Sequence, residues 1–434
     1  MIAPVPPTRI HNWAAFGAAS EQLRKYAKIG DESDFIENQI KSQLFSFDDN
    51  GMYRDPNEPM VYDTVTRLQL AMALHFGFDG ESKDKLYEEL LKSADITLKL
   101  QSVTGEIPFG GRSAQFLHNE AHYAALCEYY ACVFKNRGDL NMAGQFKTAA
   151  KIATEAVELW LKGNKIYHVK NYYDNDSMYG CEGYSYFNKY MVTAASMIFS
   201  AYAMADDDIE VVLCPAMSQN YICQTSDYFH KAVLKYGDYF AEIDLKADPH
   251  YDASGLGRIH KKGFPSALCL SLPFAKEPDY TIDIKNPSYL SICAGIKNGE
   301  ATEYTCHPET EYRMVEKTIE NDFVRAKIEC ILPNGKIINQ ICTVSKNGVE
   351  FVAQSSDEVE ILFPIFSFDG TDSTQINISQ KIADVCYKGF KCVYTTDGII
   401  KDKNEIYANR NGHYKCASAE GNNRVSIKIE MMQF

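Results

Sequence analysis

The spacing of apolar residues changes halfway along the chain, and this change limits the fold more than any other feature. Before residue 205, apolar residues recur every three or four positions in seven segments, which is the repeat of an amphipathic helix. After residue 290, short stretches rich in β-branched and aromatic residues follow one another. A chain of 434 residues exceeds what one hydrophobic core usually serves, so we expect two domains.

The first half predicts consecutive helices joined by short connections. Gly30, Gly77 and Gly138 stand where helices are expected to end, because glycine readily takes a positive φ. Short connections imply antiparallel helical pairs, and a series of such hairpins predicts an (α/α) toroid. The predicted helical segments are 11–30, 31–45, 62–77, 83–101, 119–138, 139–161 and 184–205.

The second half predicts an antiparallel β-sandwich. Asn-Gly and Asp-Gly pairs favour tight hairpin turns, since both central residues can take positive φ. Six such pairs follow residue 290: Asn298-Gly299, Asn334-Gly335, Asn347-Gly348, Asp369-Gly370, Asp397-Gly398 and Asn411-Gly412. The predicted strands are 323–332, 336–344, 349–355, 359–368, 390–396 and 424–432. The predicted fold class is therefore α+β multidomain, with a toroid over residues 1–215 and a sandwich over residues 216–434.

Charge and composition exclude several classes of protein. A net charge of −14 argues against a binder of nucleic acid or of anionic membranes, although a pocket can be locally basic. We see no secretion signal and no apolar run long enough to span a membrane, so we expect a cytoplasmic protein with no membrane partner. The thirteen cysteines are scattered without a CxxC pair and predict reduced core residues rather than a metal site.

A glycine-rich turn that leads into a helix, residues 110–122, carries a dense set of polar side chains. His118, Asn119 and His122 are spaced to share one face at the start of that helix. Arg112 and Gln115 precede them on the loop, and together these residues could bind a carboxylate and transfer a proton. The alternative is that Ser113 or Asn119 only caps the helix.

Three further stretches are unusually polar and aromatic. The first spans residues 53–63. The second, 171–190, is rich in tyrosine and suits sugar stacking and hydroxyl chemistry, although Tyr186 and Tyr190 could equally face the core. The third, 248–260, predicts a loop that brings Arg258 and His260 to a cleft; the alternative is a loop that is only hydrogen-bonded across the interface between the domains. His250, Asp252 and His260 are suitable metal ligands, but we expect neither a metal nor another cofactor.

Several of these motifs resemble those of a known group of enzymes. Asn12-Trp13 in the first helix, the GGRSAQFLHNEAH stretch, the YSYFNKY helix start and the expected sandwich are similar to the toroid-plus-sandwich polysaccharide lyases, which include heparinase II/III-like and alginate-lyase-like enzymes. The resemblance covers most of the chain in architecture and short motifs in sequence. It implies an oligosaccharide or polysaccharide that contains uronic acid, cleaved by β-elimination.

The resemblance also implies roles for individual residues. β-Elimination needs hydrogen bonds that neutralise the substrate carboxylate, a base for the neighbouring ring proton and an acid for the leaving oxygen. In the family the histidine often lies on a later helix than the asparagine, whereas here both stand on one. The resemblance implies that Arg112, Gln115 and Asn119 bind the carboxylate, and that His122 or His118 is the base or the partner of the base. Tyr184 or Tyr186 would be the acid. Glu120 and Tyr173 would make further contacts with the substrate, and Arg258 and His260 would close the cleft.

Two other functions fit the same sequence. A glycoside hydrolase would need two carboxyl groups about 5–10 Å apart across a cleft, for which Asp63, Glu120 and Glu182 are candidates. A non-catalytic carbohydrate-binding protein would need only exposed aromatic side chains. The sequence leaves the oligomeric state open, a homo-oligomer included.

Overall fold

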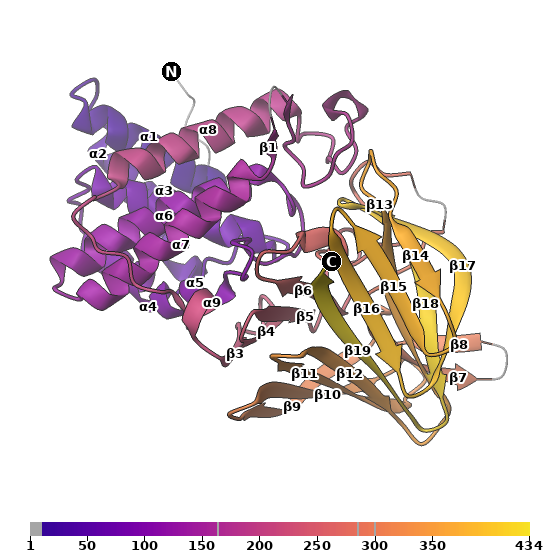
Figure 1. The fold of residues 1–434 in the computed structure, drawn as a ribbon. Helices are drawn as coiled ribbons and strands as arrows, with labels where there is room; N and C mark the ends of the chain where they lie inside the picture. The colour runs from indigo at the N-terminus through magenta and orange to yellow at the C-terminus, as the bar shows by residue number, and fades with distance from the viewer. Residues whose placement is uncertain (1–10, 163–164, 284–285, 299–300) are drawn as a thin grey trace.

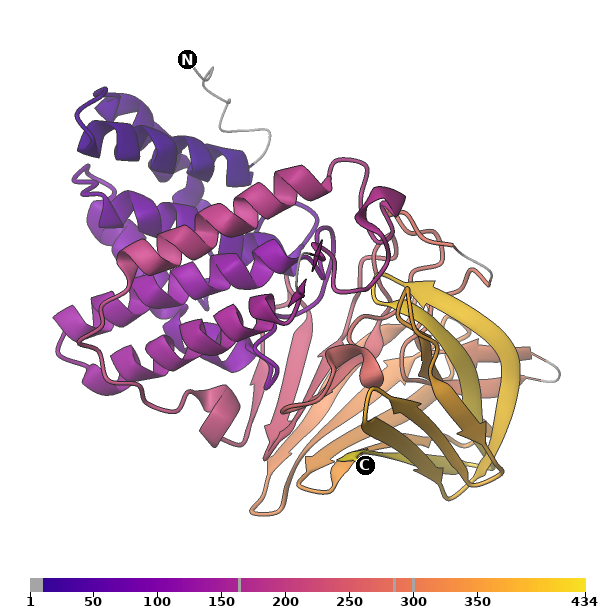
Figure 2. The same ribbon diagram turned by 45° about the horizontal axis from the view of Figure 1, so that its top comes forward.

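The computed structural model describes residues 11–162, 165–283, 286–298 and 301–434, in which a helical part is followed by antiparallel sheets (Figures 1 and 2). The α-helices are α1 (His11–Tyr26), α2 (Ser33–Gln43), α3 (Met60–His75), α4 (Lys83–Lys92), α5 (Ala94–Leu100), α6 (Leu117–Asn136), α7 (Leu140–Glu158), α8 (Phe187–Met204) and the short α9 (Pro215–Ser218). This confirms the α+β class predicted from the change in periodicity.

Several helix bounds differ from the prediction, and two of the differences have a clear local cause. The segment 83–101 forms two helices, because Ser93 interrupts it and donates from its hydroxyl to the Leu90 carbonyl at 2.7 Å. Helix α1 ends at Tyr26 instead of at Gly30. There Lys28 takes the left-handed conformation (φ 60°), and the Ile29 amide donates to the Arg24 carbonyl, which completes the helix end.

In the described part of the chain, three sheets of four or more strands follow the helices. The first is β3 (Tyr221–Gln224), β4 (Lys231–Tyr236), β5 (Tyr239–Asp244) and β6 (Gly255–Lys261), in that order. The eight-stranded sheet has the order β14-β15-β16-β19-β12-β11-β10-β9, and the five-stranded sheet β17-β18-β13-β7-β8. Their strands are β7 (Cys293–Asn298), β8 (Ala301–Tyr304), β9 (Glu311–Ile319), β10 (Phe323–Ile331), β11 (Ile337–Ser345), β12 (Gly348–Gln354), β13 (Val359–Phe368), β14 (Gln375–Ile378), β15 (Ile382–Tyr387), β16 (Phe390–Thr396), β17 (Ile399–Asn409), β18 (Gly412–Gly421) and β19 (Arg424–Gln433). A small ribbon, β1 (Leu161–Lys162) with β2 (Lys165–Ile166), follows α7.

The four-stranded sheet, which the sequence did not predict, lies between the helices and the other sheets (Figure 1). Its residues Leu234, Ala241 and Ile259 belong to the same apolar core as residues of the two larger sheets, such as Phe351 and Phe363. Its opposite side contributes Val233 and Phe240 to a second core with residues of α3 and α5. The sheet therefore joins the two halves of the molecule. The toroid, the sandwich and the boundary after residue 215 stay predictions.

The Asn-Gly and Asp-Gly pairs serve two purposes. Those at Gly335, Gly348 and Gly412 form the predicted hairpins, but only the glycine has a positive φ there, so the expectation for both central residues is wrong. Those at Gly370 and Gly398 join strands of different sheets. The pair Asn298-Gly299 lies partly outside the described residues.

Two general features follow from burial and helix composition. All thirteen cysteines are free thiols, and ten of them are buried. Within the described residues, no helix combines the length and the apolar character that crossing a bilayer requires.

Candidate active site

A cavity of about 760 Å³ opens among four helices and three loops of the helical part. Of the described residues, only ones from this part of the chain line it. They are Asn12, Trp13 and Phe16 of α1, Tyr62 and Val65 of α3, His118 and His122 of α6, Lys189, Tyr190 and Thr193 of α8, and the loop residues Asp55, Pro56, Asn57, Arg112 and Tyr184. The volume is typical of a site for a small ligand.

His122 is held in one tautomer by its own helix. Its Nδ1 lies 2.6 Å from the His118 carbonyl oxygen, which can only accept, so Nδ1 carries the proton and Nε2 keeps its lone pair. Nε2 is buried and has no hydrogen-bond partner among the described residues. Burial lowers the pKa of His122 to about 4, so the ring is neutral at pH 7 and can accept a proton at Nε2.

His118 lies beside His122 in the same wall. Burial, followed by the charges of His122, His168 and Lys170, lowers the pKa of His118 well below its usual value. Its ring centroid lies 4.2 Å from that of Tyr190. The two histidines thus keep this wall uncharged near neutral pH.

Three tyrosine hydroxyls meet at one serine. The Ser113 Oγ lies 3.0 Å from the hydroxyl of Tyr190 and 3.3 Å from the hydroxyls of Tyr184 and Tyr62. Burial raises the pKa values of Tyr184 and Tyr190 above the usual range of a phenol. Both hydroxyls therefore stay protonated at neutral pH and can donate a proton. We call Ser113 with these three tyrosines the tyrosine cluster.

The cations of the cavity outnumber its anions. Arg112 forms an ion pair with Asp55, donates to the Pro56 carbonyl at 2.6 Å and lies over the Tyr62 ring. Asp55 also accepts from the Asn12 amide and side chain at 3.0–3.1 Å. Among the described lining residues, Asp55 is the single carboxylate, whereas Arg112 and Lys189 are both cationic. The cavity therefore favours an anionic ligand.

Four of the predicted site residues line this cavity: Arg112, His118, His122 and Tyr184. Asn119 lies next to them and donates to the Ser113 carbonyl at 3.0 Å, while its Oδ1 has no hydrogen-bond partner among the described residues. Tyr186 precedes α8, is 54% exposed and does not line the cavity. Tyr173 stacks on Tyr179 with ring centroids 3.6 Å apart, away from the cavity.

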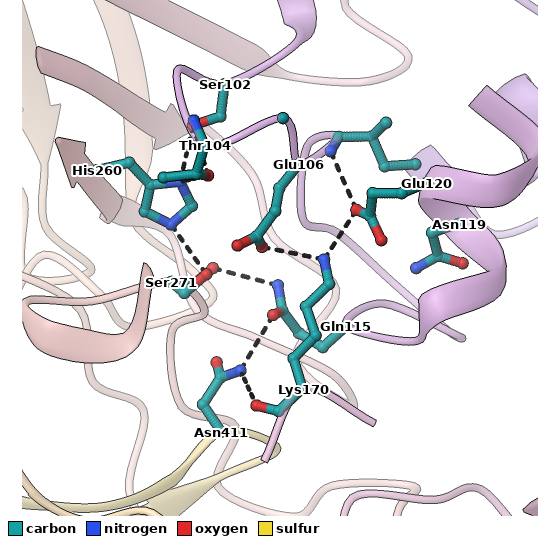
Figure 3. Close-up of polar contacts among 12 residues, drawn as sticks. Ser102, Thr104, Glu106, Gln115, Asn119, Glu120, Lys170, His260, Ser271 and Asn411 are labelled. Carbon is teal, nitrogen blue, oxygen red and sulfur yellow. Dashed lines mark hydrogen bonds and ion pairs between the residues drawn. The ribbon is translucent and has the colours of Figure 1, made fainter. Parts of the chain in front are cut away.

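Gln115, Glu120 and His260 lie instead in a buried polar network (Figure 3). Lys170 Nζ contacts Glu120 Oε1 at 2.8 Å and Glu106 Oε2 at 2.9 Å. The Gln115 Oε1 accepts from Asn411 at 3.0 Å. His260 contacts Ser102 and Ser271 through its two ring nitrogens, at 2.7 and 3.0 Å, and burial lowers its pKa to about 3. This network connects the helical part to the sheets.

The stretch 248–260 differs from its prediction as a loop. Residues 255–261 form strand β6, where Arg258 is fully buried, pairs with Glu242 at 3.1 Å and donates to the Ile107 carbonyl at 2.7 Å. Arg258 and His260 therefore hold the helical part against the four-stranded sheet and do not line the cavity. Nor does the described part of the chain gather three or more metal-ligating side chains of His, Cys, Asp or Glu.

Three residues at the cavity and in the tyrosine cluster, Tyr190, Ser113 and Lys189, are not among the predicted site residues. For Tyr190 the sequence leaves open whether it faces the core or the site; the residue is buried, and its hydroxyl reaches Ser113. Ser113 was considered only as a helix cap, although its left-handed φ of 62° is unusual for a serine. Lys189 stands within the YSYFNKY stretch, but the sequence assigns no role to it.

Comparison with known proteins identifies no family. No family model and no curated protein matches the chain. Among solved structures, heparinase III has a TM-score of 0.39 at 10% identity, covering 100% of this chain and 72% of that one. Heparan sulfate lyase HepC from Pedobacter heparinus has a TM-score of 0.42 at 8% identity, covering 97% and 69%. A GH127 β-arabinofuranosidase has a TM-score of 0.30 at 10% identity, covering 94% and 67%. With every TM-score below 0.5, these likenesses assign neither a family nor an activity.

Proposed function

We propose that the chain is a carbohydrate-active enzyme that cleaves a uronic-acid-containing oligosaccharide by β-elimination in this cavity. The observation that carries the proposal is the pairing of His122, whose Nε2 lone pair is unused, with protonated tyrosine hydroxyls in one partly cationic cavity. A base and an acid in one site are what this elimination requires.

The residues divide the work as follows. Arg112 and Lys189 attract the uronate carboxylate, which makes the ring proton beside it more acidic. His122 Nε2 takes that proton, the bond to the leaving oxygen breaks, and a carbon–carbon double bond forms in conjugation with the carboxylate. Tyr190 or Tyr184 gives a proton to the leaving oxygen. A bound carboxylate near His122 would raise the pKa of that histidine and so make it a stronger base.

Hydrolysis by paired carboxylates has less support. The three carboxylates considered for it, Asp63, Glu120 and Glu182, are all buried in ion pairs and do not line the cavity. Their partners are Arg67, Lys170 and Arg410. Asp55 alone would leave such a mechanism without its second carboxyl group.

The test is an absorbance assay for the unsaturated uronate product on a panel of uronic-acid oligosaccharides, with reducing-sugar release measured in parallel. His122→Gln should lower the rate by about 10²–10⁴-fold, because it removes the base, and a loss of the same order is expected in Tyr190→Phe or in Tyr184→Phe, whichever hydroxyl is the acid. Tyr202→Phe, on the exposed side of α8, is the matched control and should keep the wild-type rate. Reducing sugar released without the absorbance would mean hydrolysis and would overturn the proposal.

A further inference from the structure

The loop Gly110–Gln115 that brings Arg112 to the cavity and Ser113 to the tyrosine cluster has an unfavourable backbone. Its residues Gly110, Gly111, Ser113 and Gln115 have φ values of 136°, 71°, 62° and 66°. Two of these residues are not glycine, and such conformations persist only where the surroundings hold them. The contacts that hold this loop therefore matter for the site.

One of these contacts leads to a residue at the far end of the chain. The Ser113 amide donates to Glu182 Oε1 at 2.5 Å, and Arg410 Nη2 lies 2.6 Å from that same oxygen. Arg410 also donates to the Gly180 carbonyl at 2.6 Å and lies over the Tyr280 ring, 4.0 Å from its centroid. Arg410 follows β17 and is fully buried, but it does not line the cavity.

The charge of Arg410 keeps Glu182 a good acceptor. Burial would raise the pKa of Glu182, but the charge and the hydrogen bond of Arg410, together with backbone hydrogen bonds that include the Ser113 amide, hold that pKa below its usual value. Without the guanidinium, the buried carboxyl would take up a proton more readily and would bind the Ser113 amide more weakly. The Glu182 side chain would also lose the partner that fixes its position.

We propose that Arg410 is a positioning residue that, through Glu182, holds Ser113 and with it the tyrosine cluster in place. The sheet part of the chain then contributes to the site without touching the substrate. The effect on the loop does not depend on the proposed function; only the expected effect on turnover rests on it.

Amide hydrogen exchange with residue-level resolution tests this directly. In Arg410→Lys, the Ser113 amide should exchange about tenfold faster, since it loses much of a charge-assisted hydrogen bond. The Gly111 amide is an internal reference in the same loop, because it donates to Asp252 Oδ2 at 3.1 Å and has no link to Glu182. Unchanged exchange at Ser113 would overturn the proposal.

Arg67→Lys is the matched control. Arg67 is as deeply buried as Arg410 and is paired with Asp63, but it makes no contact with the loop. In Arg67→Lys, the difference between the exchange rates of the Ser113 and Gly111 amides should stay as in the wild type. If the Ser113 amide exchanged as much faster in Arg67→Lys as in Arg410→Lys, the cause would be a general loosening of the protein, and the proposal would be contradicted.

If Arg410→Lys does not fold, the double variant Glu182→Gln with Arg410→Met removes both charges together and should also raise the exchange rate of the Ser113 amide.

Turnover gives the second measurement. Arg410→Lys should lower kcat while leaving KM nearly unchanged, because Arg410 acts on the Ser113 amide through Glu182 and does not line the cavity. If the proposed elimination is absent, hydrogen exchange still decides the role of Arg410. A third outcome is that elimination occurs and that Arg410→Lys exchanges faster at Ser113 but has an unchanged kcat. Arg410 would then hold the loop, but the position of the loop would not limit catalysis, and the catalytic part of the proposal would be contradicted.

Discussion

At the scale of single residues, one hydrogen bond sets the chemistry of His122. The carbonyl one turn earlier fixes the proton on Nδ1, and burial keeps the ring neutral. The i, i+4 spacing of the two histidines predicted that they share a face, and both do line the cavity. The spacing could not show that Asn119 and Gln115 are used by the protein itself, through Ser113 and Asn411.

The low pKa of His122 predicts a pH-dependent stability. The unfolded chain binds a proton at this histidine with a pKa near 6.5, whereas the folded chain does so near 4. Between these values the unfolded state holds more protons, so the free energy of unfolding falls as the pH drops from about 6.5 to about 4. His122→Gln should remove roughly 2–3 kcal/mol of that fall, on the order of the shift in pKa.

Urea unfolding at about pH 7 and about pH 4.5 measures this difference. His260 contributes a fall of the same sign, so the variant should keep part of the pH dependence. An identical loss of stability in wild type and His122→Gln would show that His122 is not buried as a neutral ring.

At the scale of elements, the loop before α6 has a backbone conformation that its own residues do not favour and that contacts with distant residues hold in place. Glycines at 110 and 111 predicted a turn, but the positive φ of Ser113 and Gln115 follows from contacts with residues far along the chain. Strand β6 is a similar case. Its polar residues Arg258 and His260 suggested a loop at a cleft, yet they lie in a strand and are hydrogen-bonded to Ile107 and Ser102 of the helical part.

Paired substitutions at Ser113 separate strain from chemistry. Ser113→Gly and Ser113→Ala both remove the hydroxyl that the three tyrosines contact, but only glycine takes a φ of 62° without strain. Ser113→Gly should therefore be more stable than Ser113→Ala by about 1 kcal/mol, while both lose activity to a similar extent. Thermal or urea unfolding of the two variants measures the difference. Equal stabilities would mean that position 113 is not strained.

At the scale of the whole molecule, the two parts are joined through buried charge. Lys170 is 2% exposed and bridges Glu106 with Glu120 of α6, and Asn411 next to it comes from the turn between β17 and β18. The change of hydrophobic period predicted the two kinds of structure and most strands after residue 320. It could not predict this layer, because its members lie up to some 300 positions apart and none follows a repeat.

Lys170→Met should lower the free energy of unfolding by about 3–5 kcal/mol, because it leaves two buried carboxylates without their cation. Adding Glu106→Gln and Glu120→Gln should restore part of that loss, since the uncompensated charges are then gone. Urea unfolding of the single and triple variants measures both effects. A triple variant less stable than Lys170→Met would contradict this account of the layer.

The most direct test of the central claim is ligand binding reported from the cavity itself. The chain has two tryptophans, and Trp13 lines the cavity with 54% of its surface exposed, whereas Trp160 packs near Tyr172. In a Trp160→Phe variant, titration with a uronic-acid oligosaccharide should change the fluorescence emission of Trp13 until the site is saturated. Adding Arg112→Gln should raise the Kd about tenfold, because a charge-assisted contact with the carboxylate is lost. A neutral oligosaccharide of the same length should bind more weakly. Equal binding of the neutral sugar would contradict the assignment of this cavity as the site. So would an unchanged Trp13 signal with a uronate oligosaccharide that the protein is found to cleave.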